Sequence, residues 1–297
     1  MYPYTLFLGM TAYDLCVIGG VALAFFLFIR LADKKGVCAK LQLLVVIGAS
    51  LAVFLGFVFA TLTQSFYNYL STGVFRWEGM TFYGGLVGGA LVFFAVYFIA
   101  GRRVFAYDKG GKNAAVNGNG DKKPHKDDKD VNAHKREFFT VVDILVCALC
   151  FGHAVGRLGC LFAGCCHGKL YAESRPFTLP VRVLSVNGDL LYTRYAVPVQ
   201  LFEAAFLCLL GVFLTVRVVK GKRYGLSFYC FLYGVWRFLI EFARGDDRGA
   251  TVISFLSPSQ LTALFLIAFS VFFVLSERRR LQKEGQEKTS DNEAKND

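Results

Sequence analysis

Three ionisable residues near the end of an apolar stretch lie at helical spacing. Arg237, Glu241 and Arg244 occupy positions i, i+4 and i+7, which places them on one face of a helix. A charge inside a membrane span is costly and is usually paired or functional. Arg237 and Glu241 could neutralise each other as a closed pair, but the second arginine leaves the face net positive. We therefore expect this face to bind an anion.

A glycine-rich stretch carries a further arginine. Residues 152–169 read GHAVGRLGCLFAGCCHGK. Glycines permit an irregular backbone, which at membrane depth is tolerated only where protein or a wet cavity surrounds it. We predict that Arg157 projects from a helix end into such a cavity. A guanidinium holds a phosphate in two places and keeps its charge, and lipid headgroups are the nearest phosphates.

The same stretch contains a cysteine cluster. Cys160, Cys165, Cys166 and His167 form C-x4-C-C-H, which is not a standard zinc spacing. We predict no metal and expect close packing of small residues, although an oxidising exterior would permit a disulfide from Cys160 to Cys165 or Cys166. His167 or His153 could transfer a proton, but a lone histidine on a loop is more often an ordinary hydrogen-bonding residue.

Two more segments place polar residues at the ends of apolar stretches. Tyr83 lies in Phe82-Tyr-Gly-Gly, where the glycines indicate close helix packing and the phenol could donate to an oxyanion or assist proton transfer. Gln200 and Glu203 lie near the start of another apolar stretch. A helix cap is an adequate alternative role for Gln200.

The composition favours a membrane protein. Of the 297 residues, 55% are hydrophobic and 19% are charged, and the net charge is +11. Average soluble domains are about 45–50% apolar and about 25% charged. Nucleic-acid binding is disfavoured, because the basic residues flank apolar stretches and are not interleaved with an aromatic platform for bases. We predict contact with a lipid bilayer, no nucleic acid and no cofactor.

Seven stretches are long and apolar enough, or nearly so, to cross a hydrocarbon layer of about 30 Å. We predict an all-α polytopic membrane protein with about seven transmembrane helices. The fourth stretch is short and the sixth contains charges, but both are predicted to span. The seven are Tyr13–Leu31, Leu41–Thr63, Phe82–Ala100, Thr140–Val155, Gln200–Val216, Gly225–Phe242 and Gln260–Ser276.

The distribution of basic residues predicts the orientation. Most of the 33 Lys and Arg fall in alternate loops and in the carboxyl-terminal tail, and positive loops mark the cytoplasmic side. The amino terminus is therefore predicted outside and the carboxyl terminus in the cytoplasm. The first basic residue is Arg30, so the start does not resemble a cleavable signal peptide.

The remaining segments complete the predicted organisation. Residues 1–276 are expected to form one membrane-embedded domain, with a mobile cytoplasmic loop at 101–139. Residues 277–297 are expected to be a disordered cytoplasmic tail, because such polar segments cannot offset their ordering entropy. Residues 157–198 are predicted to form an external head loop. Within it, Asn187-Gly188-Asp189 separates two strand-like runs and predicts a small β-hairpin.

Taken together, the motifs resemble the prolipoprotein diacylglyceryl transferase family of bacterial inner membranes. They occur in the family's order, span nearly the whole chain, and form a quite specific set although each is weak alone. The matching elements are Phe82-Tyr-Gly-Gly, Gly156-Arg-Leu-Gly159 leading to Gly164 and Gly168, Pro198-Val-Gln-Leu-Phe-Glu203, and Arg237 to Arg244 followed by Asp246-Asp247.

The resemblance implies an enzyme that transfers the diacylglyceryl group of phosphatidylglycerol to a cysteine thiol in a prolipoprotein signal peptide and releases glycerol phosphate. By matched position, Arg157 is the main phosphatidylglycerol-binding residue, supported by Arg237 and Arg244. The expected active site opens toward the outer leaflet. Its implied catalytic residues are Arg157, Arg237, Tyr83 and Glu241, and its supporting residues are Gln200, Glu203, Cys160, Cys165, His167, Gly156, Gly159, Gly164 and Gly168.

Three positions depart from the family pattern. Tyr83 stands where a histidine is usual, Cys160 where an asparagine is expected, and Cys165 where a glutamate is expected. Lipid binding is therefore better supported than the particular acceptor. A divergent relative with another acceptor is one alternative; a non-enzymatic anion or lipid transporter and a redox or metal protein are the others.

Overall fold

The computed structural model describes residues 5–7, 9–77, 79, 81–103, 133–184, 190–245 and 256–293. The chain divides into two compact units, which are described separately. The first comprises Met1–Leu31 and Val142–Asp297, and the second comprises Ala32–Val141.

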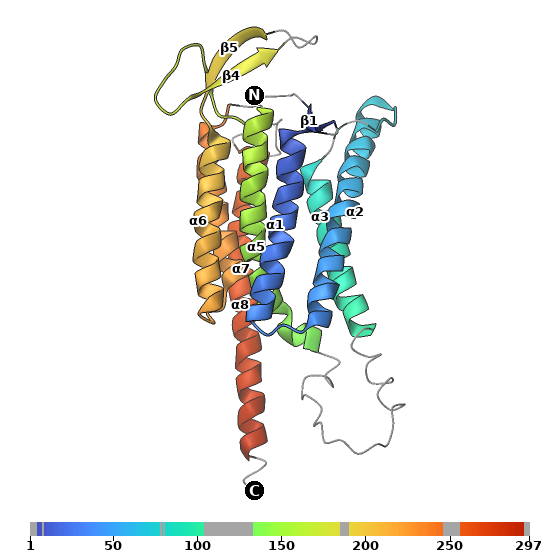
Figure 1. The fold of residues 1–297 in the computed structure, drawn as a ribbon. Helices are drawn as coiled ribbons and strands as arrows, with labels where there is room; N and C mark the ends of the chain where they lie inside the picture. Colours follow the sequence, from blue (N-terminus) through green and yellow to red (C-terminus); the bar gives the residue numbers. More distant parts are fainter. Residues whose placement is uncertain are drawn as a thin grey trace. The chain divides into compact units, whose positions relative to one another are not determined.

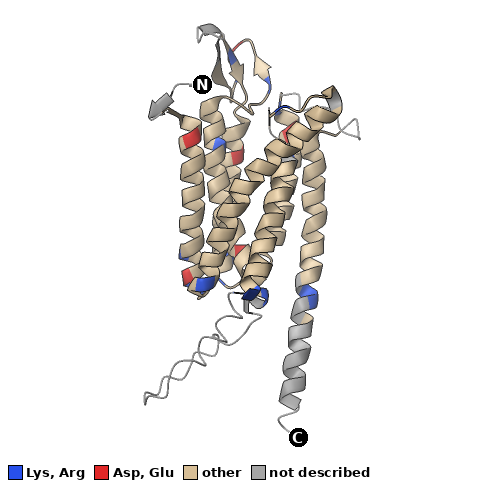
Figure 2. Ribbon diagram, turned by 90° about the vertical axis from the view of Figure 1, so that its right-hand side faces the viewer, with Lys and Arg blue, Asp and Glu red and all other residues tan. Residues whose placement is uncertain are grey.

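Seven helices among the described residues are long and apolar enough to cross a membrane. Each overlaps one of the seven stretches predicted from the sequence, so the chain is a mostly helical multi-pass membrane protein. Figure 2 shows that most described charges lie near helix ends. In chain order the helices are α1 (Ala12–Lys34), α2 (Ala39–Thr72), α3 (Phe82–Ala95) with its π-helical extension η1 (Val96–Ala100), α5 (Ala133–Ala163), α6 (Val199–Val219), α7 (Gly225–Ile240) with the 3-10 turn η4 (Glu241–Ala243), and α8 (Pro258–Glu293).

Small residues bring the helices of the first unit into close contact. A Cβ on Gly20 of α1 would lie 2.7 Å from the carbonyl oxygen of Gly152 in α5. On α7, a Cβ on Gly234 would lie 2.9 Å from Ile267 Cγ1 of α8. The absence of side chains lets the backbones approach, as in other membrane helix pairs. The resulting packing of α7 on α8 and of α1 on α5 can be followed in Figure 1.

The second unit pairs α2 with α3 in the same way. A Cβ on Gly85 would lie 3.1 Å from the carbonyl oxygen of Gly56, so the glycines after Tyr83 serve close helix packing, as the sequence indicates. Further along, the Tyr97 hydroxyl donates a 2.7 Å hydrogen bond to the carbonyl of His134. This bond ties the end of the α3 segment to the start of α5.

A three-stranded antiparallel sheet lies between α5 and α6 in the sequence. It consists of β3 (Leu170–Tyr171), β4 (Leu179–Leu184) and β5 (Leu190–Ala196) in the order β3-β5-β4. Figure 1 shows β4 and β5 beyond the amino-terminal end of α6. The Asn187-Gly188-Asp189 turn lies outside the described residues. A second small sheet, β1 (Thr5–Phe7) with β2 (Met10–Thr11), was not predicted.

Two predicted boundaries differ from the structure. The head loop was expected to begin at Arg157, but α5 continues to Ala163, because Gly159 packs against Cys16 and Tyr13 of α1 instead of breaking the helix. The tail was expected to be disordered from residue 277, but α8 runs to Glu293. That segment is rich in Glu, Lys, Arg and Gln, which are good helix formers.

The loop predicted at 101–139 is shorter in the structure at both ends. Residues 101–103 are helical and α5 begins at Ala133. Residues 104–132 lie outside the described residues.

Candidate active site

Glu241 joins two buried arginines at the end of α7. Its carboxylate lies 2.9 Å from Arg237 and 3.7 Å from Nε of Arg244. The Ser257 hydroxyl donates a 2.8 Å hydrogen bond to the other carboxylate oxygen, and Arg237 donates to Ser259 at 2.7 Å. One carboxylate therefore orients two guanidinium groups, and the cluster keeps a net positive charge.

The backbone of this cluster is not the continuous helix that the i, i+4, i+7 spacing predicts. α7 ends at Ile240, a 3-10 turn covers Glu241–Ala243, and Arg244 is extended, with ψ of 151°. Arg244 instead forms a β-bridge with Gly168. The prediction of a single helical face was wrong for Arg244, yet the tighter turn still brings its guanidinium to Glu241.

Arg157 forms a second buried ion pair, with Glu203 of α6. The two side chains are 2.9 Å apart, with Arg157 16% exposed and Glu203 fully buried. The Tyr233 hydroxyl of α7 donates a 2.9 Å hydrogen bond to the same carboxylate. Nε of Arg157 is buried and has no hydrogen-bond partner within the part of the chain that the structure describes. An anion beside this guanidinium would supply the missing acceptor.

The loop after α5 is fixed to both sides of this region. Gly164 ends α5 with φ of 79°, a left-handed conformation that favours glycine. Gly168 donates to the carbonyl of Val197 at 2.8 Å, and a Cβ there would lie 2.7 Å from the carbonyl oxygen of Ala243. Only glycine fits this position, so Gly168 holds the loop between the start of α6 and the end of α7.

The other predicted supporting residues take different places. Gln200 does not cap α6; its amide donates a 2.6 Å hydrogen bond to the carbonyl of Cys165. His167 keeps its Nδ1 2.8 Å from the carbonyl oxygen of its neighbour Gly168, which is the ordinary role that the sequence favoured. Apart from the neighbouring α5 backbone, no heavy atom of the described residues comes within 4 Å of a Cβ placed on Gly156, so the α5 surface beside Arg157 is open there.

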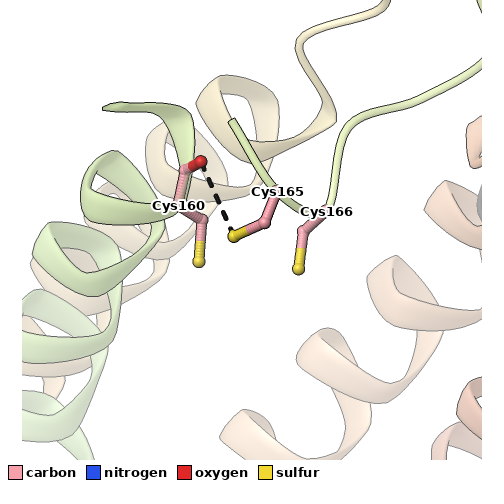
Figure 3. A group of neighbouring side chains, drawn as sticks. All are labelled: Cys160, Cys165 and Cys166. Atoms are coloured by element: carbon pink, nitrogen blue, oxygen red, sulfur yellow. Dashed lines mark hydrogen bonds between the residues drawn. The ribbon is translucent and has the colours of Figure 1, made fainter. Parts of the chain in front are cut away.

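Three cysteines converge beside the arginines. The Sγ atoms of Cys160, Cys165 and Cys166 all lie within 4.8 Å of one another, and no disulfide joins them. Figure 3 shows Cys160 on the last turns of α5 and the other two on the loop that follows. Hydrogen bonds from the Cys160 and Cys165 thiols and from Arg244 lower the pKa of Cys166. Interaction with the Cys160 and Cys166 side chains raises the pKa of Cys165.

Tyr83 is the second residue of α3, which belongs to the second unit, and its side chain lies outside the described residues. Its chemical role therefore stays a prediction.

Sequence reasoning missed three polar partners. Tyr233 lies four residues before Arg237 on α7, so its helical face was a usable signal. Ser257 and Ser259 carry no such signal, because only the approach of α8 to α7 brings them to Glu241 and Arg237. His153 is also nearby, with its ring centroid 5.6 Å from that of Tyr233.

Comparison with known proteins shows what the chain is similar to. Residues 130–276 match the family described as prolipoprotein diacylglyceryl transferase. The phosphatidylglycerol–prolipoprotein diacylglyceryl transferase of Clostridium tetani is 35% identical over 145 residues, which are 48% of this chain and 55% of that protein. The corresponding transferase 2 of Clostridium perfringens is 32% identical over 157 residues, which are 52% of this chain and 59% of that protein. The chain thus spans little more than half the length of these two curated relatives.

A longer match extends beyond this region. The transferase of the same name from Dehalococcoides mccartyi (strain ATCC BAA-2100) is 26% identical over 275 residues, which are 89% of this chain and 88% of that protein. The family match itself includes the elements that carry Arg157, Glu203, Arg237 and Glu241. Over residues 130–276 the chain is thus similar to the prolipoprotein diacylglyceryl transferase family, and the longer relative extends this similarity over most of its length.

Proposed function

We propose that this protein transfers the diacylglyceryl group of phosphatidylglycerol to the cysteine thiol of a prolipoprotein signal peptide. Glycerol phosphate is the second product. Its relatives carry this activity in their names, and they do not favour a transporter or an enzyme with another acceptor. We place the protein in the bacterial cytoplasmic membrane, with residues 1–276 acting as one transferase domain and the site open to the outer leaflet.

One observation carries the proposal: three arginines, each buried or mostly buried, lie in two ion-pair groups that share helix α7. Arg157 pairs with Glu203, which accepts from Tyr233 of α7. One helical turn later on α7, Arg237 pairs with Glu241, which also contacts Arg244. The two groups together hold three guanidinium groups and two carboxylates, which leaves one positive charge in excess. A lipid phosphodiester carries the single negative charge that would balance it.

The chemistry of the transfer needs such a site. The acceptor sulfur attacks the glyceryl CH2 carbon as a thiolate, a carbon–sulfur bond forms, and the bond from that carbon to the phosphate ester oxygen breaks. Negative charge then accumulates on the departing glycerol phosphate. Fixed guanidinium groups aimed at that oxygen stabilise the transition state more than the ground state. We assign phosphate binding to Arg157, Arg237 and Arg244, and their orientation to Glu203 and Glu241.

The test is transfer by purified full-length protein in phosphatidylglycerol vesicles. A signal peptide with a single cysteine is the acceptor, and both the lipidated peptide and the released glycerol phosphate are measured. Loss of one donor to a developing oxyanion costs about 100–1,000-fold in rate, so Arg157→Ala should lower transfer by at least that factor. Arg194→Ala, which removes an exposed arginine of β5, is the matched control and should retain activity. Full activity of Arg157→Ala would refute the proposal.

A further inference from the structure

We propose that Cys160, Cys165 and Cys166 form a thiolate site for Zn²⁺ whose fourth coordination position takes the acceptor thiol. This inference rests on the proposed function, because it assigns that acceptor a binding position. It revises the expectation of no metal, which was based on linear spacing alone. Two of the three residues stand at the departures from the family pattern, Cys160 and Cys165.

The geometry of the three sulfurs suits a tetrahedral ion. Zinc–sulfur bonds of about 2.3 Å place ligand sulfurs about 3.8 Å apart, and the three Sγ atoms lie within 4.8 Å of one another. Figure 3 shows the Cys165 side chain directed toward Cys160, and its Sγ lies 3.8 Å from the Cys160 carbonyl oxygen. The left-handed residues Gly164 and Cys166 produce this reversal. Small side-chain rotations would close the sulfurs around an ion.

The number of ligands points to an open site. Structural zinc sites are closed by four protein ligands, whereas catalytic sites use three and leave one position for water or substrate. Among the described residues, no histidine or carboxylate joins the three cysteines as a fourth ligand. Cys165 is exposed and the other two are half-buried, so an external ligand has access. An incoming thiol would complete a four-sulfur tetrahedron.

Arginine side chains lie beside the three cysteines, and they would balance the negative charge of a zinc–thiolate group and hold it beside the lipid phosphate. Three thiolates with Zn²⁺ carry one negative charge, and a fourth thiolate adds another. Arg244 contacts Cys166, and Arg157 precedes Cys160 by three residues on α5, so the two side chains are neighbours on one face. A sulfur held at the ion would therefore lie next to the phosphate held by Arg157.

Metal binding would supply the thiolate that the reaction requires. A thiol that coordinates zinc is deprotonated, and its proton goes to solvent. The bound thiolate then attacks the glyceryl carbon, and the electron pair of the breaking carbon–oxygen bond leaves with glycerol phosphate. No redox change occurs, and the thioether product is a weaker ligand that can depart. This route provides an activated nucleophile without the family's usual histidine.

Cobalt binding tests the site independently of catalysis. Co²⁺ replaces Zn²⁺ in thiolate sites and gives a sulfur-to-metal charge-transfer band whose intensity rises with each thiolate. Reduced, detergent-purified full-length protein should bind one equivalent of Co²⁺, which Zn²⁺ displaces. Loss of a residue that only hydrogen-bonds to a metal ligand lowers metal affinity about 10–100-fold. Cys160→Ser and Cys166→Ser each remove a ligand itself, so each should lower the Co²⁺ affinity by more than that. Cys208→Ser, which alters an exposed cysteine of α6, should bind like the unaltered protein.

A signal peptide then tests the fourth position. Adding the signal peptide with its single cysteine should raise the charge-transfer band by about one third, because one thiolate is added to three. The same peptide with serine in place of that cysteine should leave the band unchanged. The inference would be overturned if Cys160→Ser bound metal as well as the unaltered protein, or if the cysteine peptide left the band unchanged. It would also be overturned if the protein bound Cu⁺ but not Zn²⁺, or if protein isolated without reductant contained a disulfide among the three cysteines.

The outcomes also separate this inference from the proposed function. A Cys160→Ser/Cys165→Ser/Cys166→Ser variant that transfers lipid at the normal rate without metal would refute the zinc site and leave the transferase assignment intact. Protein that binds zinc and the cysteine peptide but releases no glycerol phosphate would refute the transferase assignment.

Discussion

At the scale of single residues, the arginines of this site depend on their carboxylate partners. An ionised group out of water costs several kcal/mol unless it is paired, and removing one partner of a buried pair costs about 3–5 kcal/mol. Glu203 is fully buried and pairs with Arg157, while Tyr233 donates to the same carboxylate. The carboxylate therefore contributes to the stability of the fold as well as to the position of the proposed phosphate ligand.

Glu203→Gln tests this dependence. The substitution keeps the shape of the side chain but leaves the Arg157 charge uncompensated, so we expect a lower thermal midpoint in detergent and slower lipid transfer. Glu173→Gln, at an exposed carboxylate, should leave the midpoint unchanged. An unaltered midpoint for Glu203→Gln would show that the ion pair contributes nothing to stability.

Tyr83 gives a second prediction at this scale. On the zinc route proposed above, the acceptor thiol needs no protein base, so we propose for the Tyr83 phenol the other role that the sequence allowed, donation to the departing phosphate oxygen. General acid catalysis typically contributes about 100–10,000-fold. Tyr83→Phe should therefore lower the turnover rate by a factor in that range, with little change in the lipid concentration that gives half-maximal rate. A variant as active as the unaltered protein would exclude the phenol from the reaction.

At the scale of elements, the approach of α7 to α8 positions Arg237. A Cβ on Gly234 would lie 2.9 Å from Ile267 Cγ1 and 3.0 Å from the carbonyl oxygen of Ala263. Gly234→Val should force the helices apart and weaken the hydrogen bond from Arg237 to Ser259. Overpacking typically costs about 1–3 kcal/mol, so the thermal midpoint and transfer should both fall.

Gly19→Ala is the control for this prediction. Gly19 lies within α1, and within the described part of the chain no atom beyond the adjacent α1 backbone comes within 4 Å of a Cβ placed there. Replacing an unconstrained helical glycine with alanine stabilises a helix by about 0.5–1 kcal/mol, so its midpoint should not fall. Equal midpoints for Gly234→Val and the unaltered protein would show that α7 and α8 can separate at no cost.

The elements also show what a sequence can reveal. All seven spans could be predicted, because long apolar runs are a local property of the chain. The extension of α5 to Ala163 could not, since Gly156 and Gly159 indicate a break unless the packing of Gly159 on α1 is known. The 3-10 turn at Glu241–Ala243 could not be predicted either, because the spacing of Arg237, Glu241 and Arg244 also fits a continuous helix. Only the β-bridge of Arg244 to Gly168 shows that the helix ends before it.

The site was predictable to a similar extent. Arg157, Arg237 and Glu241 stand out because charges in apolar segments are rare and costly. Their partners Ser257 and Ser259 have unremarkable types and meet them only through tertiary packing. The sequence shows three cysteines close together along the chain, but their spacing does not predict that the three sulfurs converge. The convergence depends on a chain reversal at Gly164 and Cys166.

At the scale of the whole molecule, the orientation predicted from the basic loops has to place the proposed site on the side where both substrates arrive. Phosphatidylglycerol and a translocated signal peptide must reach the site from the same side, and the predicted outer side carries the β3-β5-β4 sheet and the cysteines. Basic loops such as the one containing Lys220 and Lys222 lie on the predicted cytoplasmic side. Retention of these loops in the cytoplasm would fix the orientation of every helix.

Epitope insertion into the full chain tests this orientation. A tag after Arg175, in the exposed segment between β3 and β4, should bind antibody added to intact spheroplasts. A tag after Gly221, in the exposed turn between α6 and α7, should bind only after the membrane is permeabilised, because the positive charges around it oppose translocation. Each tagged protein should retain lipid transfer, which shows that it is folded. The reverse pattern of access in active protein would place the arginines and cysteines at the cytoplasmic leaflet, where a translocated cysteine could not reach them.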